Sequence, residues 1–422
     1  MGLWDDERFL AGGLSARARR AGAAYAGPGS GNDVAQAERP PIAFTGGLPD
    51  PALLPADALA ASTAAVLATD HNAALQYGGG QGWEGLREWL ASHWGALDGV
   101  ELSPTHFMLA NGSAGALASV CETFLDEGDV VGVERPSFPL SIRAIRQVTP
   151  RIESIPVDDD GVDVDVLADR LAALERAGER MRLLYLIPSF HNPTGSTLTL
   201  ERRTRVIELC HRYGVLVVED DAYRELYFEE APPPSLYALA GGEGVLKLGT
   251  FSKVVAPGVR VGWCQASPRL IEPLVATRTD MGTSPLLIRV LAHYAGTGAL
   301  EPHIAGLRTA YARKCAAMLN ALEGSCAGLA TWNHPIGGFF VWVTLDDAVD
   351  PLLLVETARE EAVTFVGGHL FTNEHTKGEG PRTRWGPGDS KYLRLAFSYV
   401  ASDEIAEGID RLGRAIKSAV RS

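Results

Sequence analysis

Gly249-Thr250-Phe251-Ser252-Lys253-Val254-Val255-Ala256-Pro257-Gly258-Val259-Arg260 is the stretch around which the rest of the chain is organised. It follows the apolar run 245–248, which predicts a buried strand, so Lys253 lies just past the carboxyl end of a strand, where α/β sheets bind ligands. Its apolar neighbours desolvate the amine, which disfavours the ammonium form and makes the amine a better nucleophile. Arg260 offers a guanidinium fork suited to a phosphate. This pair suggests a covalently held aldehyde cofactor with a phosphate, a description that fits pyridoxal phosphate; a surface lysine without a function is the alternative.

Size and charge narrow the possible functions. The chain has 422 residues, 46% of them hydrophobic and 21% charged, which is typical of a globular protein with room for a large and a smaller domain. A formal net charge of −14 argues against broad binding of nucleic acid or anionic membranes. The 5 cysteines are scattered without a CxxC pair, which predicts reduced thiols in a cytoplasmic protein, and no metal site is expected. No apolar run reaches the length of a membrane span, and the acidic N-terminus does not resemble a secretory signal.

The order of apolar runs, glycine-rich turns and helical segments predicts an α/β fold. Strands are expected at 107–110, 130–133, 183–187, 215–218, 245–248 and 261–265. Their apolar residues are continuous rather than alternating, which favours a mostly parallel sheet covered on both faces. After about residue 305 a long helix and a late strand over 392–397 indicate a smaller α+β domain. We therefore predict an N-terminal helix and arm over 1–41, a large cofactor-binding domain over 42–304, whose first part could pack with the small domain, and a small C-terminal domain over 305–422.

Polar residues follow several of the predicted strands. Asn111-Gly112-Ser113-Ala114-Gly115 stands between a strand and a helix, where backbone N–H groups and the helix dipole would hold a phosphate; a tight structural turn is the alternative. Asp220 and Tyr223 end a buried strand. The carboxylate could keep a pyridine nitrogen protonated with the tyrosine hydroxyl beside the ring oxygen, or the pair could be a helix N-cap and a packed tyrosine. Asn192 follows a neighbouring strand, and its amide could donate to the same ring oxygen.

Two further residues fit the same cleft. Phe138 could lie flat on a cofactor ring, or it could be an ordinary core residue. Arg394 stands on an apolar strand, and a buried guanidinium demands an anionic partner. A substrate carboxylate would meet that demand, and a structural salt bridge would meet it equally. Each feature alone is a moderate signal, but together they place a cofactor and a carboxylate at one edge of the predicted sheet.

With these residues in place, the chain resembles the fold-type I pyridoxal-phosphate-dependent aminotransferases of the class I/II group. It is most similar to the branch that contains α-aminoadipate and broad-specificity amino-acid aminotransferases, and the match runs from Phe44 to the C-terminus. The motifs that carry the resemblance are Gly46-Gly47-Leu48-Pro49-Asp50, Gln76-Tyr77-Gly78, Asn192-Pro193-Thr194-Gly195, Glu219-Asp220-Asp221-Ala222-Tyr223, Thr250-Phe251-Ser252-Lys253 and Leu393-Arg394-Leu395.

The resemblance implies a role for each candidate residue. Lys253 would hold the cofactor covalently and later shuttle a proton, while Asp220 would pair with the ring nitrogen. Asn192 and Tyr223 would bond the ring oxygen, and Phe138 would stack on the ring. The other cofactor-binding residues would be Ser113, Ala114, Gly115, Thr250, Ser252 and Arg260, joined by Tyr77 from a neighbouring subunit, which implies a homodimer with shared active sites. Substrate would contact Gly47, Asn192 and Arg394, the last through its α-carboxylate.

The implied reaction moves an amino group between an L-amino acid and a 2-oxo acid, with glutamate and 2-oxoglutarate as the expected pair. Other pyridoxal-phosphate chemistry on the same fold, such as an oxidase, cyclase or elimination enzyme of specialised metabolism, is the alternative, because its catalytic residues would be nearly identical. A transcription regulator with a borrowed aminotransferase domain would need a winged helix-turn-helix, and the roughly forty residues before Phe44 are too few for that module.

Three features depart from the family pattern or carry no assigned role. His191 stands where the family commonly has Gln, and its role is either to support its neighbours or to contact substrate. The loop over 371–391 is longer than expected and could read the distal end of a substrate or be solvated charge; its charged and aromatic residues are His375, Lys377, Arg382, Arg384 and Trp385. An N-terminal helix over 5–25 could bring a basic cluster over an acidic substrate, namely Arg17, Arg19 and Arg20.

Overall fold

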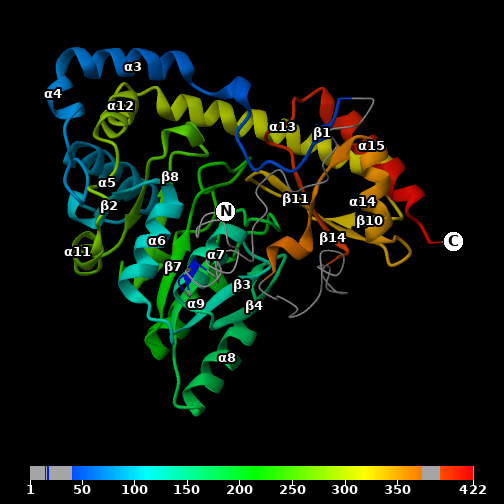
Figure 1. The fold of residues 1–422 in the computed structure, drawn as a ribbon, viewed down its shortest axis with the longest axis horizontal. Coiled ribbons are helices and arrows are strands. Elements are labelled where there is room, and N and C mark those ends of the chain that lie inside the picture. The colour runs from blue at the N-terminus through cyan, green and yellow to red at the C-terminus, as the bar shows by residue number, and fades with distance from the viewer. Residues whose placement is uncertain (1–14, 16, 19–39, 373–389, 422) are drawn as a thin grey trace, which may run out of the picture.

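The computed structural model describes residues 15, 17–18, 40–372 and 390–421. Most of the predicted N-terminal helix and arm, and most of the loop over 371–391, lie outside these residues. Figure 1 shows a large lobe that contains β2 to β9 and a smaller lobe that contains β10, β11 and β14, with α13 running from one to the other. Among the described residues no helix is both long enough and apolar enough to cross a bilayer.

An eight-stranded sheet forms the centre of the large lobe, in the order β2-β9-β8-β7-β6-β3-β4-β5. Its strands are β2 (Phe107–Ala110), β3 (Val130–Arg135), β4 (Ile152–Asp158), β5 (Gly161–Val162), β6 (Met181–Leu186), β7 (Leu216–Asp220), β8 (Val245–Thr250) and β9 (Gly262–Gln265). The five neighbours β8, β7, β6, β3 and β4 run parallel, whereas β9 is antiparallel to both β8 and β2. Every residue of β2, β8 and β9 is buried, as expected for strands covered on both faces. The predicted mostly parallel α/β sheet is confirmed.

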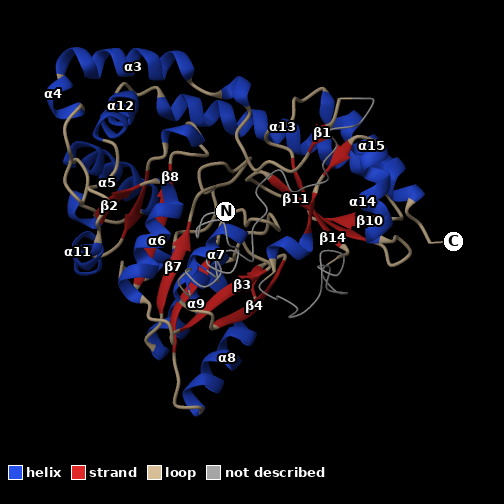
Figure 2. Ribbon diagram, in the orientation of Figure 1, coloured by secondary structure: helices blue, strands red, loops and turns tan. Residues whose placement is uncertain are grey.

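Helices cover both faces of this sheet, as Figure 2 shows. They are α5 (Glu84–Asp98), α6 (Gly112–Phe124), α7 (Pro139–Val148), α8 (Val164–Arg176), α9 (Leu200–Tyr213), α10 (Leu236–Leu239), α11 (Pro268–Thr277) and α12 (Pro285–Gly296), with α3 (Ala56–Thr69) and α4 (His71–Ala74) packed on α12. Local sequence sets the ends of α9. The Thr199 side chain accepts a hydrogen bond from the backbone N–H of Arg202, and Gly214 ends the helix in a left-handed conformation with φ 64°.

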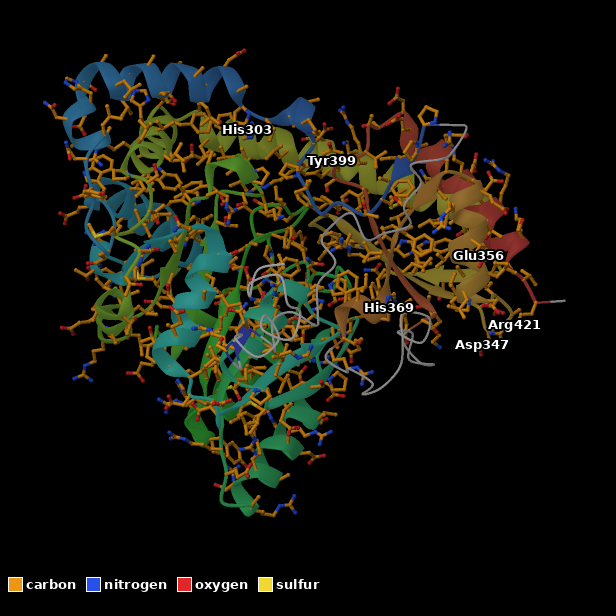
Figure 3. The ribbon with its side chains drawn as sticks, viewed as in Figure 1. His303, Asp347, Glu356, His369, Tyr399 and Arg421 are labelled. Atoms are coloured by element: carbon orange, nitrogen blue, oxygen red, sulfur yellow. The ribbon has the colours of Figure 1, made fainter. Side chains whose placement is uncertain are left out.

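A separate antiparallel sheet, in the order β10-β11-β14-β13, forms the small lobe. Its strands are β10 (Ala330–Trp332), β11 (Phe340–Leu345), β13 (Val366–Gly367) and β14 (Tyr392–Ala396), and its helices are α13 (Leu300–Cys326), α14 (Pro351–Glu360) and α15 (Glu404–Ser418). The strand β1 (Ile42–Ala43) pairs in parallel with β12 (Val363–Thr364), so the segment that leads to Gly47 is tied to this lobe. His303, labelled on α13 in Figure 3, has a hydrogen bond with the backbone of Val254. The helix α13 therefore also contacts the turn that carries Lys253.

Candidate active site

Lys253 lies in the turn that follows β8, at the carboxyl edge of the parallel strands. Its Nζ donates a 2.8 Å hydrogen bond to the backbone carbonyl of Gly47, so the lysine bridges the large sheet and the segment that leads from β1. The rings of Tyr223 and Phe339 lie 5.5 and 5.7 Å from Nζ. Burial, and then the positive charge of Arg394, lower the pKa of Lys253 from its ordinary 10.5 to about 8. A larger fraction of the amine is therefore neutral and nucleophilic near neutral pH.

Asp220 is the last residue of β7, and its side chain is buried. The residues that follow it form turns rather than a helix, so the helix N-cap alternative is wrong. Its Oδ2 accepts a 2.7 Å hydrogen bond from the hydroxyl of Tyr185, whereas its Oδ1 has no hydrogen-bond donor among the described residues. Burial raises the pKa of Asp220 to about 6, and the hydrogen bond from Tyr185 opposes that rise. Because a buried carboxylate oxygen without a donor is costly, Oδ1 is suited to accept from a bound group.

Asn192 lies between two other candidate residues. Its Oδ1 accepts a 2.9 Å hydrogen bond from Nη1 of Arg394, and its side chain is also hydrogen-bonded to Tyr223. Burial raises the pKa of Tyr223, which keeps its hydroxyl protonated and able to donate. The amide of Asn192 is thereby fixed beside the tyrosine hydroxyl, in the arrangement expected of two groups that share one ring oxygen.

Arg394 lies on β14 with only 7% of its surface exposed. Its Nη2 donates a 2.6 Å hydrogen bond to the carbonyl of Thr45, and the guanidinium lies 4.4 Å from the ring centre of Phe340 and 4.9 Å from that of Phe371. The two aromatic faces and the neutral acceptors fix the orientation of the fork. A buried, oriented guanidinium of this kind is suited to bind a carboxylate.

The start of α6 and the turn after β8 face each other and form a candidate phosphate site. Nη2 of Arg260 donates a 3.0 Å hydrogen bond to the carbonyl of Asn111, and Nη1 lies 3.4 Å from Oγ of Ser252. Oγ of Ser252 lies 2.9 Å from Oγ1 of Thr250. Gly112 has a φ of +75°, and a Cβ there would lie 2.5 Å from Nη2 of Arg260, so only glycine allows this approach. Two hydroxyls, a guanidinium and a helix N-terminus together suit a phosphate.

The remaining predicted site residues lie around this arrangement. Ser113, Ala114 and Gly115 belong to the first turn of α6. Phe138 directly precedes α7 and is partly buried against the hydrophobic core. The position of Gly47 requires the absence of a side chain, because a Cβ would lie 2.8 Å from the ring of Phe340. Tyr77 lies in the loop before α5 and is 82% exposed, which leaves its side chain available to a second subunit.

His191 and Arg17 were predicted without a firm role. The buried ring of His191 lies between two partners, with Nε2 3.2 Å from Oε2 of Glu134 and Nδ1 2.9 Å from Oγ1 of Thr194. This geometry fits a supporting role next to Asn192 better than contact with substrate. Arg17 pairs with Glu122 on α6 at 3.1 Å. Arg19, Arg20 and the residues singled out in the loop over 371–391 lie outside the described residues.

Tyr185 and Glu134 were not predicted as site residues. Tyr185 bonds Asp220, and Glu134 contacts His191 while accepting a 2.7 Å hydrogen bond from the backbone N–H of Ile187. Tyr185 occupies an apolar strand, where a tyrosine resembles an ordinary core residue. The one signal in the sequence was its polar hydroxyl within an otherwise apolar run, since a buried hydroxyl needs a partner.

The residues present fit pyridoxal phosphate. The unpaired Oδ1 of Asp220 suits a protonated ring nitrogen, and the approach that Gly112 permits brings Arg260 to the phosphate site at the start of α6. The amine of Lys253, with its lowered pKa, suits the aldehyde.

Comparison with known proteins agrees with this geometry. A family model described as aminotransferase class I and II matches residues 46–412. The chain is 39% identical to a 2-aminoadipate transaminase of Thermus thermophilus, covering 90% of this chain and 91% of the relative. It is 34% identical to aromatic-amino-acid aminotransferase 1 of Thermococcus litoralis, covering 90% and 89%. Among solved structures, the kynurenine aminotransferase of Pyrococcus horikoshii, in complex with PMP, has a TM-score of 0.88 at 32% identity and 100% coverage of both chains.

Proposed function

The chain belongs to the class I and II aminotransferases, and on that premise we propose that it accepts several L-amino acids as donors and 2-oxoglutarate as the acceptor. It is an aminotransferase with pyridoxal 5'-phosphate as its cofactor. The breadth of donors is supported by the names of the 2-aminoadipate transaminase and the aromatic-amino-acid aminotransferase to which the chain is similar. Their donors have different side chains and share only the amino and carboxylate groups on the α-carbon.

One observation carries the proposal. Nζ of Lys253 bonds the carbonyl of Gly47, and the guanidinium of Arg394 bonds the carbonyl of Thr45, two residues earlier in the same segment. Two residues of extended chain span about 7 Å. The amine that acts at the α-carbon and the fork that binds the α-carboxylate therefore lie side by side, at a separation that suits the two groups of one α-amino acid.

Each residue has a defined task in this arrangement. When bound, the cofactor supplies an electron sink for the charge that develops at the α-carbon of the substrate. Arg394 orients the α-carboxylate, so that the proton on the α-carbon points to Lys253. The amine of Lys253 takes that proton. Its pKa of about 8 is close to neutral pH, which suits a group that accepts and returns a proton. The carboxylate of Asp220 would hold the proton of the ring nitrogen, and Asn192 and Tyr223 would hydrogen-bond the ring oxygen.

A panel of donors and acceptors tests the function. L-2-aminoadipate, L-leucine and L-phenylalanine are expected to yield their 2-oxo acids with 2-oxoglutarate as acceptor. Without any acceptor, each active site is expected to release one equivalent of 2-oxo acid and then stop. Continued turnover without an acceptor would instead indicate oxidase or elimination chemistry, and activity with only one of the three donors would contradict the proposed breadth.

We further propose a homodimer with shared active sites, in which Tyr77 reaches the cofactor phosphate of the partner. The support is a group of large apolar side chains that are strongly exposed in one subunit: Leu75 is 64%, Tyr77 82% and Met281 61% exposed. These loops adjoin, because a Cβ on Gly282 would lie 2.8 Å from the carbonyl of Gly79.

Mixing two impaired variants tests the sharing. Neither Lys253→Ala nor Tyr77→Ala alone should show full activity, but their heterodimer contains one site with both Lys253 and the partner's Tyr77. Each heterodimer formed by subunit exchange is therefore expected to have about half of the activity of a wild-type dimer. A sedimentation experiment that finds only monomer, or exchanged heterodimers without restored activity, would overturn the proposal.

Two other assignments are proposals with structural support. The division into a large domain over 42–304 and a small one over 305–422 is supported by the two separate sheets, whose strands lie within 107–265 and 330–396. A cytoplasmic location is supported by the cysteines, all five of which are buried and free.

A further inference from the structure

Tyr185, on β6, is fully buried and forms a short chain of polar contacts that ends at Asp220. Its hydroxyl oxygen lies 2.7 Å from Oδ2 of Asp220 and 2.8 Å from Oγ of Ser141 on α7. A phenol carries a single proton, and a carboxylate is a stronger acceptor than a hydroxyl. The proton of Tyr185 therefore points to Asp220, and the hydroxyl of Ser141 donates to the phenol oxygen. The chain has one direction, from Ser141 through Tyr185 to the carboxylate.

This contact decides which oxygen of Asp220 is available. Oδ2 is occupied by Tyr185, and Oδ1 has no donor among the described residues. We propose that Tyr185 is a positioning residue that keeps Asp220 in its carboxylate form, with Oδ1 directed at the ring nitrogen of the cofactor. The inference rests on the role proposed above for Asp220 at that nitrogen, and extends the site to a residue on a neighbouring strand.

The surroundings show why Asp220 needs such a donor. Burial favours its protonated form, and so do the nearby acidic groups Asp221 and Glu134, while the positive charge of Lys253 favours the carboxylate. The hydrogen bond from Tyr185 also favours the carboxylate. If Asp220 took up a proton of its own, it would no longer hold the proton of the ring nitrogen. The phenol therefore supports the charge state on which the cofactor depends.

Three variants separate this role from ordinary packing. Tyr185→Phe removes only the hydroxyl, and Asp220→Asn removes the charge itself. Tyr237→Phe is the matched control: Tyr237 is also buried, and it lies on α10 rather than in the candidate site. All three are tested for binding of pyridoxine 5'-phosphate, which lacks the aldehyde and so binds without reaction at Lys253. The absorption spectrum of bound pyridoxal phosphate is then followed as a function of pH.

The expected result is that Tyr185→Phe binds pyridoxine 5'-phosphate roughly ten- to a hundredfold more weakly than wild type. Asp220 loses the hydrogen bond that favours its carboxylate form, and a bond to a charged group is worth a factor of that size. Its spectral transition should move toward that of Asp220→Asn, and kcat should fall more than KM changes. Tyr237→Phe should match wild type in affinity and spectrum. Were Tyr185→Phe not to fold, Ser141→Ala would be used instead, and it should shift affinity and spectrum in the same direction by a smaller amount.

The outcomes distinguish the two linked claims. If Asp220→Asn matches wild type in affinity and spectrum, the proposed role of Asp220 at the ring nitrogen fails. If Asp220→Asn differs from wild type but Tyr185→Phe, or Ser141→Ala in its place, does not, only the role of Tyr185 is overturned. Equal losses in Tyr185→Phe and Tyr237→Phe would also overturn it, because they would show a general effect of removing a buried hydroxyl.

Discussion

Replacing Arg394 by alanine should reduce catalysis selectively for donors that carry an α-carboxylate. Arg394 is only 7% exposed, and hydrogen bonds to Asn192 and Thr45 fix the orientation of its guanidinium. In the alanine variant the substrate carboxylate would lie in this buried position without its cation. Leaving one partner of a buried charge pair unmatched costs about 3–5 kcal/mol. At 1.36 kcal/mol per factor of ten, kcat/KM should fall by roughly two to three and a half orders of magnitude.

The lysine variant refines this expectation. Arg394→Lys keeps the positive charge but loses the fork, and with it about one charge-assisted hydrogen bond of about 1.5–3 kcal/mol. Its kcat/KM should therefore fall by roughly ten- to a hundredfold, between wild type and the alanine variant.

Phenylalanine and 2-phenylethylamine form the decisive pair of donors, because they differ only in the α-carboxylate. Wild type should strongly prefer phenylalanine, and Arg394→Ala should lose most of that preference while its small residual rate with the amine is unchanged. Arg411→Ala is a matched control, since Arg411 is 8% exposed but lies on α15 and bonds the carbonyls of Pro40 and Ala362. Equal losses for both donors in Arg394→Ala, or a kcat/KM that stays near wild type, would refute the reasoning.

In the cofactor-free protein, the rate at which Lys253 reacts with pyridoxal phosphate should rise until about pH 8 and then level off, because the pKa of the lysine is lowered to about 8. Stopped-flow absorbance measures this rate. A rate that still climbs near pH 10.5, the ordinary pKa of lysine, would contradict the prediction. Burial raises the pKa of Asp220 from 3.8 to about 6, so the folded protein binds a proton at this carboxyl more tightly than the unfolded chain does. The proton therefore adds to the free energy of unfolding in full below pH 3.8, and this addition is lost as the pH rises through about 6. In urea unfolding of the cofactor-free protein, the free energy of unfolding of wild type should therefore fall by about 3 kcal/mol more than that of Asp220→Asn between pH 3.8 and about 6. Parallel pH profiles of the two proteins would disprove the raised pKa of Asp220. Gly112→Ala places a Cβ 2.5 Å from Nη2 of Arg260 at a φ of +75°, so it should weaken the binding of pyridoxine 5'-phosphate and destabilise the protein by about 1–3 kcal/mol. The control Gly306→Ala adds a Cβ to open space on α13 and should do neither. Similar behaviour of the two variants would argue against the close approach between Gly112 and Arg260.

The strands of the large sheet were predictable from the sequence where all of their residues are buried, because such a strand is a continuous run of apolar residues. The strand over 107–110 was predicted with its observed bounds, but β7 continues through Glu219 to Asp220, two residues beyond the predicted end. These acids remain in the strand because their carboxylates accept hydrogen bonds from buried donors: Glu219 accepts from the backbone N–H groups of Leu236 and Tyr237, and Asp220 from the hydroxyl of Tyr185. The antiparallel direction of β9 could not be predicted, since an apolar pattern shows that a strand is buried and not which way it runs.

The site was predictable at strand ends and not across strands. Lys253, Asp220 and Asn192 each follow or end an apolar run, where a polar residue stands out from its neighbours. Tyr185 is separated from Asp220 by 35 positions, and only the pairing of β6 with β7 brings the two together. The role of Thr45 was also hidden, because it acts through its backbone carbonyl, which every residue type possesses.

Reduction of the purified protein with borohydride, followed by peptide mass spectrometry, tests the central claim most directly. The structure places one amine of lowered pKa, that of Lys253, beside the candidate sites for the ring and the phosphate. We expect a phosphopyridoxyl group on the peptide that contains Lys253, at about one per chain, and none on Lys253→Ala. A label on another lysine, or no label after incubation with pyridoxal phosphate, would contradict the account.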